Sequence, residues 1–183
     1  DFSALRYLMV AGAPMAPVKI VEAVKLFGPV MCQGFGQTES GFPLTFITPE
    51  ETAEAVSDEA LRGRLASCGR LTPLLDQLAI IDRDGQECPA GELGELVVQG
   101  SGVMKHYLGD PLATAEVQVG GWHHTGDIGH LDDDGFLYIS DRKRDLIISG
   151  GFNVFPYEVE QALLSHPQVQ ECAVVGIPHA KWG

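Results

Sequence analysis

The 183-residue chain carries 25 acidic and 12 basic side chains, a formal net charge of −13 at pH 7, and 45% of its residues are hydrophobic. This composition supplies the core of one domain, or of one domain with a small second lobe, and excludes compositional disorder. An acidic surface repels phosphate backbones, so no nucleic acid is expected as a partner. No apolar run reaches the roughly 18–20 residues of a membrane span and no signal peptide opens the chain, so we expect a soluble, cytoplasmic protein.

The charge is unevenly distributed. Residues 65–140 contain 12 acidic and 3 basic side chains, whereas residues 141–183 are nearly balanced, and this step indicates a boundary near residue 140. The cysteines are scattered, without a C-x-x-C pair or a histidine at metal-ligand spacing, so we expect reduced, structural thiols and no zinc site. They are Cys32, Cys68, Cys88 and Cys172.

The N-terminal residues have the pattern of a β-α-β unit. Residues 6–11 predict a strand, Gly12-Ala13-Pro14 breaks it, and a helix from Pro17 ends at Gly28-Pro29. A second strand over 30–33 runs into Gly34-Phe35-Gly36. Ligand sites of such units lie where the strands end.

The next segments change in character. Thr48-Pro49-Glu50-Glu51 is a capping box that opens a polar helix to about residue 61, expected to be a surface helix or an ordered loop because it has no apolar stripe. Short strands then alternate with turns and predict a small antiparallel sheet or barrel. The strands cover 77–81, 94–99, 129–131 and 136–140, and the Asp-rich turns at 82–85 and 132–135 lack the glutamate of a calcium loop.

Beyond Asp141 we expect a β pair over 145–149 and 152–155, then a helix from Pro156 to His166-Pro167, then a strand over 171–176. The predicted buried face of the helix consists of Val159, Ala162 and Leu163. The fold class is therefore mixed α/β and α+β. We expect the end of a βαβ-type subdomain over 1–64, an antiparallel β subdomain over 65–140, and the start of a small α+β domain over 141–183.

Residues 34–39 form the first motif with chemical potential. Gly34 and Gly36 allow close approach of the backbone to a ligand, and Phe35 between them can stack on a flat ring. The Thr38 hydroxyl suits a phosphate oxygen and the Glu39 carboxylate suits Mg²⁺ beside phosphates. The Rossmann fingerprint is not met, because Glu39 stands where its third glycine belongs. An ordinary glycine-rich turn is an equal alternative.

Three further motifs follow. A buried Asp127 after Thr125-Gly126 is a good acceptor for a ribose diol, whereas His123 and His124 point to opposite faces of a strand and are expected to contact solvent or to pack. In the basic run 141–145, Arg142 can grip a phosphate or a ribose, or else belong to a solvated hairpin end. Gly150-Gly151 lets the backbone lie against a ligand or turn sharply.

In this order and spacing, the motifs resemble those of the adenylate-forming superfamily, which includes AMP-forming acyl-CoA synthetases, aryl-CoA ligases, peptide-synthetase adenylation domains and firefly luciferase. The resemblance covers nearly the whole chain. The residues that carry it are Gly12-Ala13-Pro14, Gly34–Glu39, Gly91–Leu96, Gly121–Asp127, Asp141–Ile147, Gly150–Val154 and Pro156–Glu160.

The resemblance implies roles for individual residues. Phe35 would stack on adenine, with Gly34, Gly36 and the Gly12-Ala13-Pro14 loop lining that side. Thr38 would bind the AMP phosphate and Glu39 would hold Mg²⁺, which makes these two the catalytic pair. Asp127 would bind the ribose with help from Arg142, Arg144 would be the hinge, and Gly151 would lie beside the path of CoA. Phe35 stands where tyrosine is commoner, and Arg144 where aspartate or lysine is usual.

The implied function is that of an ATP-dependent, AMP-forming carboxylic acid–CoA ligase, which forms an acyl-adenylate and then a thioester with CoA. Within the family, Gly121–Asp127 and Ser149–Glu160 resemble CoA ligases more than peptide-synthetase domains, and a medium- or long-chain fatty acid is the favoured carboxylate. Small residues near Gly12, Gly34 and Gly41 fit a long apolar tunnel but do not require one. The alternatives are an aryl-CoA ligase, a peptide-synthetase-type adenylation domain and a non-catalytic nucleotide-binding module.

Two parts of the family pattern are not found in these 183 residues: a Gly/Ser/Thr-rich phosphate loop with a lysine, and the adenylating lysine near the family's C-terminus. Lys181 has the wrong context to replace the latter. We therefore expect a piece of a longer two-domain enzyme that is inactive by itself.

Overall fold

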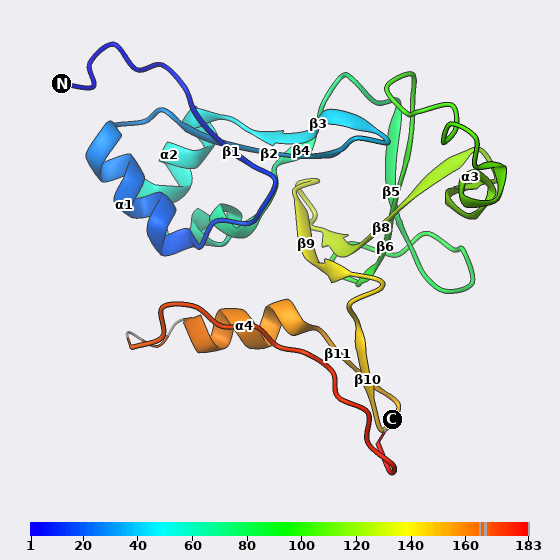
Figure 1. The fold of residues 1–183 in the computed structure, drawn as a ribbon. Helices are drawn as coiled ribbons and strands as arrows, with labels where there is room; N and C mark the ends of the chain where they lie inside the picture. Colours follow the sequence, from blue (N-terminus) through cyan, green and yellow to red (C-terminus); the bar gives the residue numbers. More distant parts are fainter. Residues whose placement is uncertain (165, 167, 183) are drawn as a thin grey trace.

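A computed structural model describes residues 1–164, 166 and 168–182. The first strand β1 (Leu8–Ala11) leads through α1 (Pro17–Phe27) to the parallel strand β2 (Met31–Gln37), which confirms the predicted β-α-β unit (Figure 1). Two antiparallel strands, β3 (Gly41–Ile47) and β4 (Arg70–Leu71), complete a four-stranded sheet in the order β1-β2-β3-β4.

Helix α2 (Pro49–Ser57) begins with the predicted capping box, in which the Thr48 hydroxyl accepts from the Glu51 N–H and the Glu51 carboxylate accepts from the Thr48 N–H. The expected surface position is wrong, because Ala55 is fully buried together with Ile20 of α1 and Leu65. Leu65 belongs to the 3₁₀ segment η1 (Glu59–Ala66). The buried face of α2 consists of small residues, and a search for large apolar side chains misses it.

The predicted antiparallel sheet is confirmed, in the order β5-β6-β8-β7 with β9 on the other edge of β8. The expected strand at 129–131 is only the end of β8, which starts at Trp122. The first half of β8 was not predicted, because the residues buried along it are polar. The strands are β5 (Gln77–Ile81), β6 (Gly94–Gln99), β7 (Gln118–Val119), β8 (Trp122–Leu131) and β9 (Leu137–Arg142). A short helix, α3 (Pro111–Val117), was not expected from the sequence.

The two Asp-rich segments are hairpin turns, as predicted. In each turn one carboxylate oxygen of the first aspartate accepts two backbone N–H groups: Asp82 from Asp84 and Gln86, and Asp132 from Asp134 and Phe136. These carboxylates are therefore used within the turn that they stabilise.

The two sheets join directly through main-chain hydrogen bonds. The Cys68 N–H donates to the Leu137 carbonyl at 2.7 Å, and the Leu137 N–H donates to the Gly69 carbonyl at 2.9 Å. Gly69 has a φ of +84°, and a Cβ there would lie 2.0 Å from the carbonyl carbon of Phe46, so only glycine fits. Around this junction a shared core fills the space between the sheets, formed by Leu44, Leu75, Ile80, Leu96, Val98 and Leu137.

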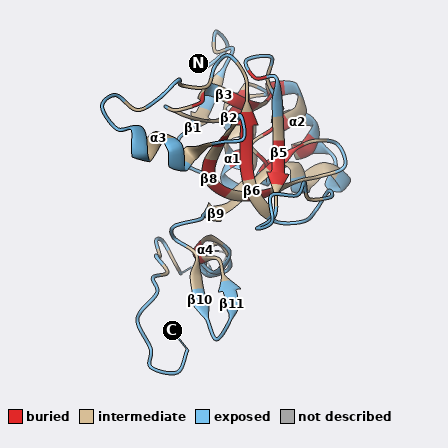
Figure 2. Cartoon of the chain, turned by 90° about the vertical axis from the view of Figure 1, so that its right-hand side faces the viewer, coloured by how far each residue is buried: buried red, intermediate tan, exposed pale blue. Residues whose placement is uncertain are grey.

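The C-terminal residues form a hairpin and a helix that project from the two sheets (Figures 1 and 2). They are β10 (Ile147–Ser149), β11 (Phe152–Val154) and α4 (Pro156–Leu164). The expected buried face of α4 is wrong, because its three residues Val159, Ala162 and Leu163 are exposed. The predicted helix stop falls partly on Pro167, which lies outside the described residues.

The strand expected over 171–176 is also wrong. This segment is extended but pairs with no strand among the residues described. It is attached to α4 instead, because the Val174 N–H donates to the Glu160 carboxylate at 2.8 Å. None of the helices that the structure describes has the length and apolarity needed to cross a membrane.

Candidate functional site

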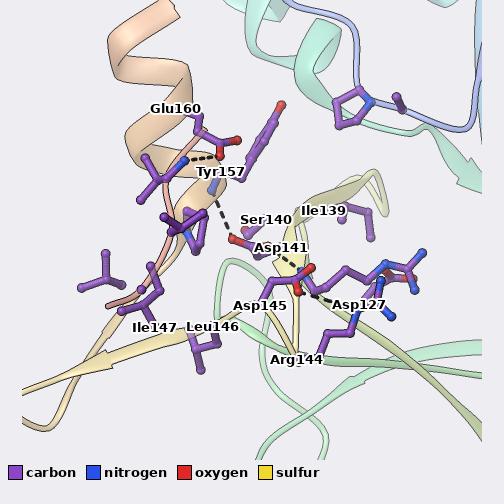
Figure 3. A pocket seen from close by; sticks show the side chains of 18 of the residues that line it. Asp127, Ile139, Ser140, Asp141, Arg144, Asp145, Leu146, Ile147, Tyr157 and Glu160 are labelled. Atoms are coloured by element: carbon purple, nitrogen blue, oxygen red, sulfur yellow. Dashed lines mark hydrogen bonds and ion pairs between the residues drawn. The ribbon is translucent and has the colours of Figure 1, made fainter. Parts of the chain in front are cut away.

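A large cavity of about 1290 Å³ separates the sheets from the C-terminal hairpin and α4. One wall consists of the ends of β1 and β2 together with β9, and the opposite wall consists of α4, β10 and the extended residues 174–179, as Figure 3 shows in part. Most of the residues predicted for the nucleotide line it, and so does the predicted hinge residue Arg144. The nucleotide residues are Gly12, Ala13, Pro14, Gly34, Phe35, Gly36, Asp127 and Arg142.

The glycine motif is part of a strand, which corrects the expectation of a turn after residue 33. Strand β2 continues to Gln37, and its glycines allow β3 to approach closely. A Cβ on Gly36 would lie 2.4 Å from the Gly41 carbonyl oxygen, and one on Gly34 would lie 3.0 Å from the Phe42 ring. The space beside Gly34 is therefore occupied by Phe42, so the small residue serves strand packing.

Asp127 is the central charged group of the large cavity. Its side chain is almost completely buried on β8, and both carboxylate oxygens have partners. Arg142 Nε lies 2.8 Å from Oδ1, and Gln37 Nε2 donates to Oδ2 at 2.6 Å. Burial raises the pKa of Asp127 above its usual value, and the contacts with Arg142 and Gln37 oppose this effect.

The backbone around Asp127 is held by Thr125. The Thr125 hydroxyl donates to the Leu96 carbonyl at 2.8 Å and accepts from the Asp127 N–H at 3.1 Å. Arg142 belongs to β9, whose register places it opposite Asp127. The two residues of the ion pair therefore lie on neighbouring strands. Arg142 has a specific acidic partner, so the alternative of a side chain surrounded only by solvent at a hairpin end is wrong.

Gln37 is a site residue that the sequence reasoning missed. Besides its bond to Asp127, its Nε2 donates to the Thr125 carbonyl at 2.9 Å. The available signal was its position, a long polar side chain directly before Thr38. That signal was weak, because nothing in the sequence indicates that β2 and β8 lie side by side there.

Thr38 and Glu39 line a second cavity of about 640 Å³, which shares Gly36, Arg142 and Arg144 with the large one. The Tyr107 hydroxyl donates to Glu39 Oε1 at 2.9 Å, and the Met104 N–H donates to the Glu39 carbonyl at 2.6 Å. Burial and the Glu39 carboxylate raise the pKa of Tyr107, so this hydroxyl remains a donor. Tyr107 was not predicted.

The oxygen atoms that line this second cavity are suitable ligands for a magnesium ion that also binds phosphate groups. Mg²⁺ prefers oxygen ligands, keeps several waters, and is commonly held by one or two carboxylates together with substrate phosphates. Glu39 supplies a carboxylate and Thr38 a hydroxyl on the same wall. Within the described part of the chain, no group of three histidine, cysteine or acidic side chains is arranged to hold a metal ion.

The two histidines lie on opposite faces of β8, as predicted. His123 is buried, and its Nε2 has no hydrogen-bond partner in the structure. Burial lowers the pKa of His123, so the ring is neutral at pH 7. His124 does more than pack or face solvent: its Nδ1 lies 3.1 Å from Glu95, which also binds Lys143 at 2.9 Å.

Two predicted residues lie in less constrained positions. Arg144 is exposed between β9 and β10, with its Nε 3.6 Å from the Asp145 carboxylate, and it borders both cavities. Gly151 lies at the exposed tip of the β10–β11 hairpin and does not line either cavity. Its φ of +86° fits the sharp turn that was the alternative for this glycine pair.

These features define a class of protein. An α/β unit ends at a cleft of nucleotide size, with a buried carboxylate in one wall and a second carboxylate beside an adjoining cavity. The whole arrangement is typical of proteins that bind and use a nucleotide at strand ends.

The comparisons with known proteins identify the family. The AMP-binding enzyme family matches residues 1–108, and the AMP-binding enzyme C-terminal domain matches residues 158–183. The chain belongs to the AMP-binding enzyme family, as the resemblance implied.

Curated relatives match along the whole chain. It is 40% identical over 183 residues to the medium/long-chain-fatty-acid–CoA ligase FadD8 of Mycobacterium tuberculosis, covering all of this chain and 30% of that protein. It is 42% identical over 179 residues to the 2-succinylbenzoate–CoA ligase of Bacillus licheniformis, covering 98% of this chain and 35% of that protein. The chain thus spans about a third of the length of these relatives.

Solved structures confirm the fold class. An amide bond synthetase from Marinactinospora thermotolerans has a TM-score of 0.88 and 38% identity, covering all of this chain and 35% of that one. An o-succinylbenzoate–CoA synthetase from Bacillus subtilis, solved in complex with ATP and a magnesium ion, has a TM-score of 0.83 and 38% identity over 98% of this chain and 35% of that one.

Proposed function

We propose that this chain forms the nucleotide-binding part of an enzyme that activates a carboxylic acid with ATP and transfers the acyl group to CoA. The observation that carries the proposal is Asp127, a buried carboxylate that is held by Arg142 on the wall of a nucleotide-sized cleft. A family match over more than half of the chain supports it.

The reaction has two steps. First, a carboxylate oxygen attacks the α-phosphorus of ATP, so that an acyl–phosphate bond forms, the bond to the β-phosphate oxygen breaks, and pyrophosphate leaves. Second, the CoA sulfur attacks the acyl carbon, the carbon–oxygen bond to AMP breaks, and the thiol proton passes to solvent. Activation is needed because a carboxylate has only an oxide as leaving group.

The residues of the two cavities have separate tasks in this proposal. Asp127 accepts the ribose hydroxyls in the large cavity, while Phe35 and the Gly12-Ala13-Pro14 loop enclose the adenine. In the adjoining cavity Thr38 donates a hydrogen bond to the α-phosphate, and Tyr107 holds the Glu39 carboxylate in place. A magnesium ion bound at Glu39 would offset the negative charge of the phosphate oxygens.

We propose a medium- or long-chain fatty acid as the carboxylate. The likeness to FadD8 supports this choice, and the large cavity has apolar residues such as Val10, Ile139 and Val175 in its lining. An aromatic acid is the second candidate, supported by the likeness to 2-succinylbenzoate–CoA ligase. The small size of Gly34 does not support a long acyl tunnel at that point, because the ring of Phe42 occupies the space beside it.

The test is a substrate panel on the full-length protein. Octanoate, palmitate, benzoate and 2-succinylbenzoate are supplied with ATP, Mg²⁺ and CoA, and pyrophosphate release and thioester formation are both measured. We expect acid-dependent release of pyrophosphate, with the highest kcat/KM for one of the two fatty acids. A preference for the aromatic acids would replace the proposed substrate class without affecting the reaction.

A binding control separates an enzyme from a non-catalytic relative. A stable acyl-AMP analogue is titrated calorimetrically into the wild type and into Asp127→Ala. Binding that is lost in the variant, together with acid-dependent pyrophosphate release, is the expected result. Absence of acid-dependent release with every acid contradicts the proposed activity, and binding that is unchanged in the variant contradicts the proposed site.

A further inference from the structure

The side chain of Gln37 connects the two cavities. It lies in the lining of the smaller cavity, while the carboxylate that it binds lies in the lining of the larger one. Its Nε2 donates to Asp127 Oδ2 at 2.6 Å and to the Thr125 carbonyl at 2.9 Å. The bond to the Thr125 carbonyl fixes the orientation of the amide group and therefore the direction of its bond to Asp127. The two hydrogens of the amide nitrogen bind two acceptors on the same strand, β8.

The two donors reach different oxygens of the Asp127 carboxylate. Arg142 Nε lies against Oδ1 and Gln37 Nε2 against Oδ2, and the Thr125 side chain also interacts with the carboxylate. Each carboxylate oxygen has two in-plane lone pairs, so a single donor does not saturate either oxygen, and a vicinal diol has two hydroxyl donors.

The two donors differ in how firmly they are held. Arg142 is about half exposed, whereas Gln37 is half-buried at the end of β2, where its register partner is Gly41 of β3. A β-bulge between Phe35 and Gln37 and the close approach of β3 at Gly36 determine where the Gln37 side chain begins. The amide is therefore the more rigid of the two constraints on the carboxylate.

We propose that Gln37 is a positioning residue that orients the Asp127 carboxylate toward the ribose diol, and thereby sets the preference of the site for ribonucleotides over deoxyribonucleotides. The inference rests on the proposed function, because it assigns the ribose to Asp127. Gln37 acts through Asp127 and need not touch the nucleotide.

The test measures the affinity of the full-length protein for AMP, 2′-deoxy-AMP and 3′-deoxy-AMP by calorimetry. Gln37→Met keeps the length of the side chain and removes its donor. We expect it to weaken AMP binding about tenfold, the usual loss for a hydrogen bond to a charged group, with little change for the deoxynucleotides. A residue that only stabilised the fold would weaken all three ligands alike.

Two variants serve as controls. Gln99→Met removes a comparable bond, from Gln99 Nε2 to the Gly121 carbonyl at 3.0 Å, without any contact to Asp127, and should leave the three affinities unchanged. Gln37→Asn keeps the polar amide and adds no charge, and it provides a test if the methionine variant does not fold. Its side chain is one methylene shorter, which withdraws the donor from Asp127, so it should also reduce the preference for AMP.

Each outcome is decisive. A preference for AMP that falls in both Gln37 variants but not in Gln99→Met supports the inference. A preference that is kept in the Gln37 variants and lost in Asp127→Asn overturns the inference and leaves the proposed function standing. A wild-type protein that does not distinguish AMP from its deoxy forms, or an Asp127→Asn variant that still does, overturns the inference together with the assignment of the ribose to Asp127, while pyrophosphate release decides the proposed activity separately.

Discussion

Residues 1–142 and residues 147–182 differ in how they are stabilised. The first region contains two clusters of buried apolar residues and two hydrogen-bonded sheets. In the second, Pro156 is the single buried side chain of the residues described, and large apolar side chains such as Ile148, Phe152 and Val175 are exposed. The described part of this region is coloured almost entirely as exposed or intermediate (Figure 2). The groups proposed to bind the nucleotide belong to the first region, and the second supplies the opposite wall of the cleft.

Few polar contacts connect these regions. The Asp141 carboxylate accepts from the Tyr157 N–H at 3.1 Å, and Arg83 donates to the Asn153 side chain at 3.3 Å. Segments with few buried contacts open at low free energy, whereas core strands open only near global unfolding. We therefore expect the second region to open at a lower free energy than the strands that carry the nucleotide-binding groups.

The largest expected effect is on stability and compares two leucines. Leu96 is fully buried between the sheets, so Leu96→Ala should lower the free energy of unfolding by roughly 2–5 kcal/mol. Leu163 is exposed on α4, so Leu163→Ala should change it by less than about 0.5 kcal/mol. Denaturant unfolding of the 183-residue chain checks both values. Equal losses would show that the two regions do not differ as described.

The next effect separates binding from stability within the first region. Asp127→Asn should weaken AMP binding roughly tenfold to a hundredfold, because a charged acceptor is lost. Since burial raises the pKa of Asp127 in the folded state, protonation of its carboxylate costs less there than in the unfolded chain. Its contribution to stability is therefore complete below the model value of 3.8 and is lost as the pH rises through the folded pKa.

The asparagine does not titrate. The thermal midpoint of the wild type should therefore improve relative to Asp127→Asn as the pH falls through that range, and scanning calorimetry between pH 7 and pH 3.5 measures the trend. If acidification instead lowers the thermal midpoint of the wild type relative to that of the variant, the effect of the ion pair with Arg142 on the pKa of Asp127 outweighs the effect of burial.

A smaller effect is expected at His123. Burial lowers its pKa below the model value of 6.5, so the stability that depends on the neutral ring is present above that pH and is lost as the pH falls through the folded pKa. His123→Phe should remove this loss, which we expect to be about 2–4 °C in the thermal midpoint for roughly 1 kcal/mol. His106→Phe, at an exposed histidine, is the matched control and should keep the wild-type pH profile.

The smallest effect concerns the contact between the regions. Arg83→Ala and Asn153→Ala each remove one exposed hydrogen bond, so each should change global stability by less than about 0.5 kcal/mol. Hydrogen exchange in residues 147–154 should nevertheless become faster, while exchange in β6 and β8 stays unchanged. Equal acceleration in the strands would contradict an independent second region.

The sequence predicted the parts of the fold that local signals determine. The helix after Pro17, the capping box at Thr48 and the turns at Asp82 and Asp132 depend on residues that are neighbours in the chain. The full length of β8 was not predictable from hydrophobicity, because its buried residues His123, Thr125 and Asp127 are polar and their partners come from other strands. Helix α4 shows the reverse case, because its apolar residues Val159 and Leu163 follow the spacing of a buried face and are nevertheless exposed.

The candidate site divides in the same way. Residues of the motifs, such as Asp127 and Glu39, could be identified because the chemistry requires their side-chain type. Gln37 and Tyr107 could not, because they act on those carboxylates from positions 90 and 68 residues away in the chain. Only the folded structure brings these pairs together.

The junction at Gly69 has a practical consequence for dividing the molecule. The two sheets exchange main-chain hydrogen bonds there and leave no room for a side chain, so an inserted tag or a new terminus at residues 67–69 would disturb the contact between the two sheets that form the cleft wall. The exposed turn around Asp84 is a better position for such a break, because it lies away from that contact.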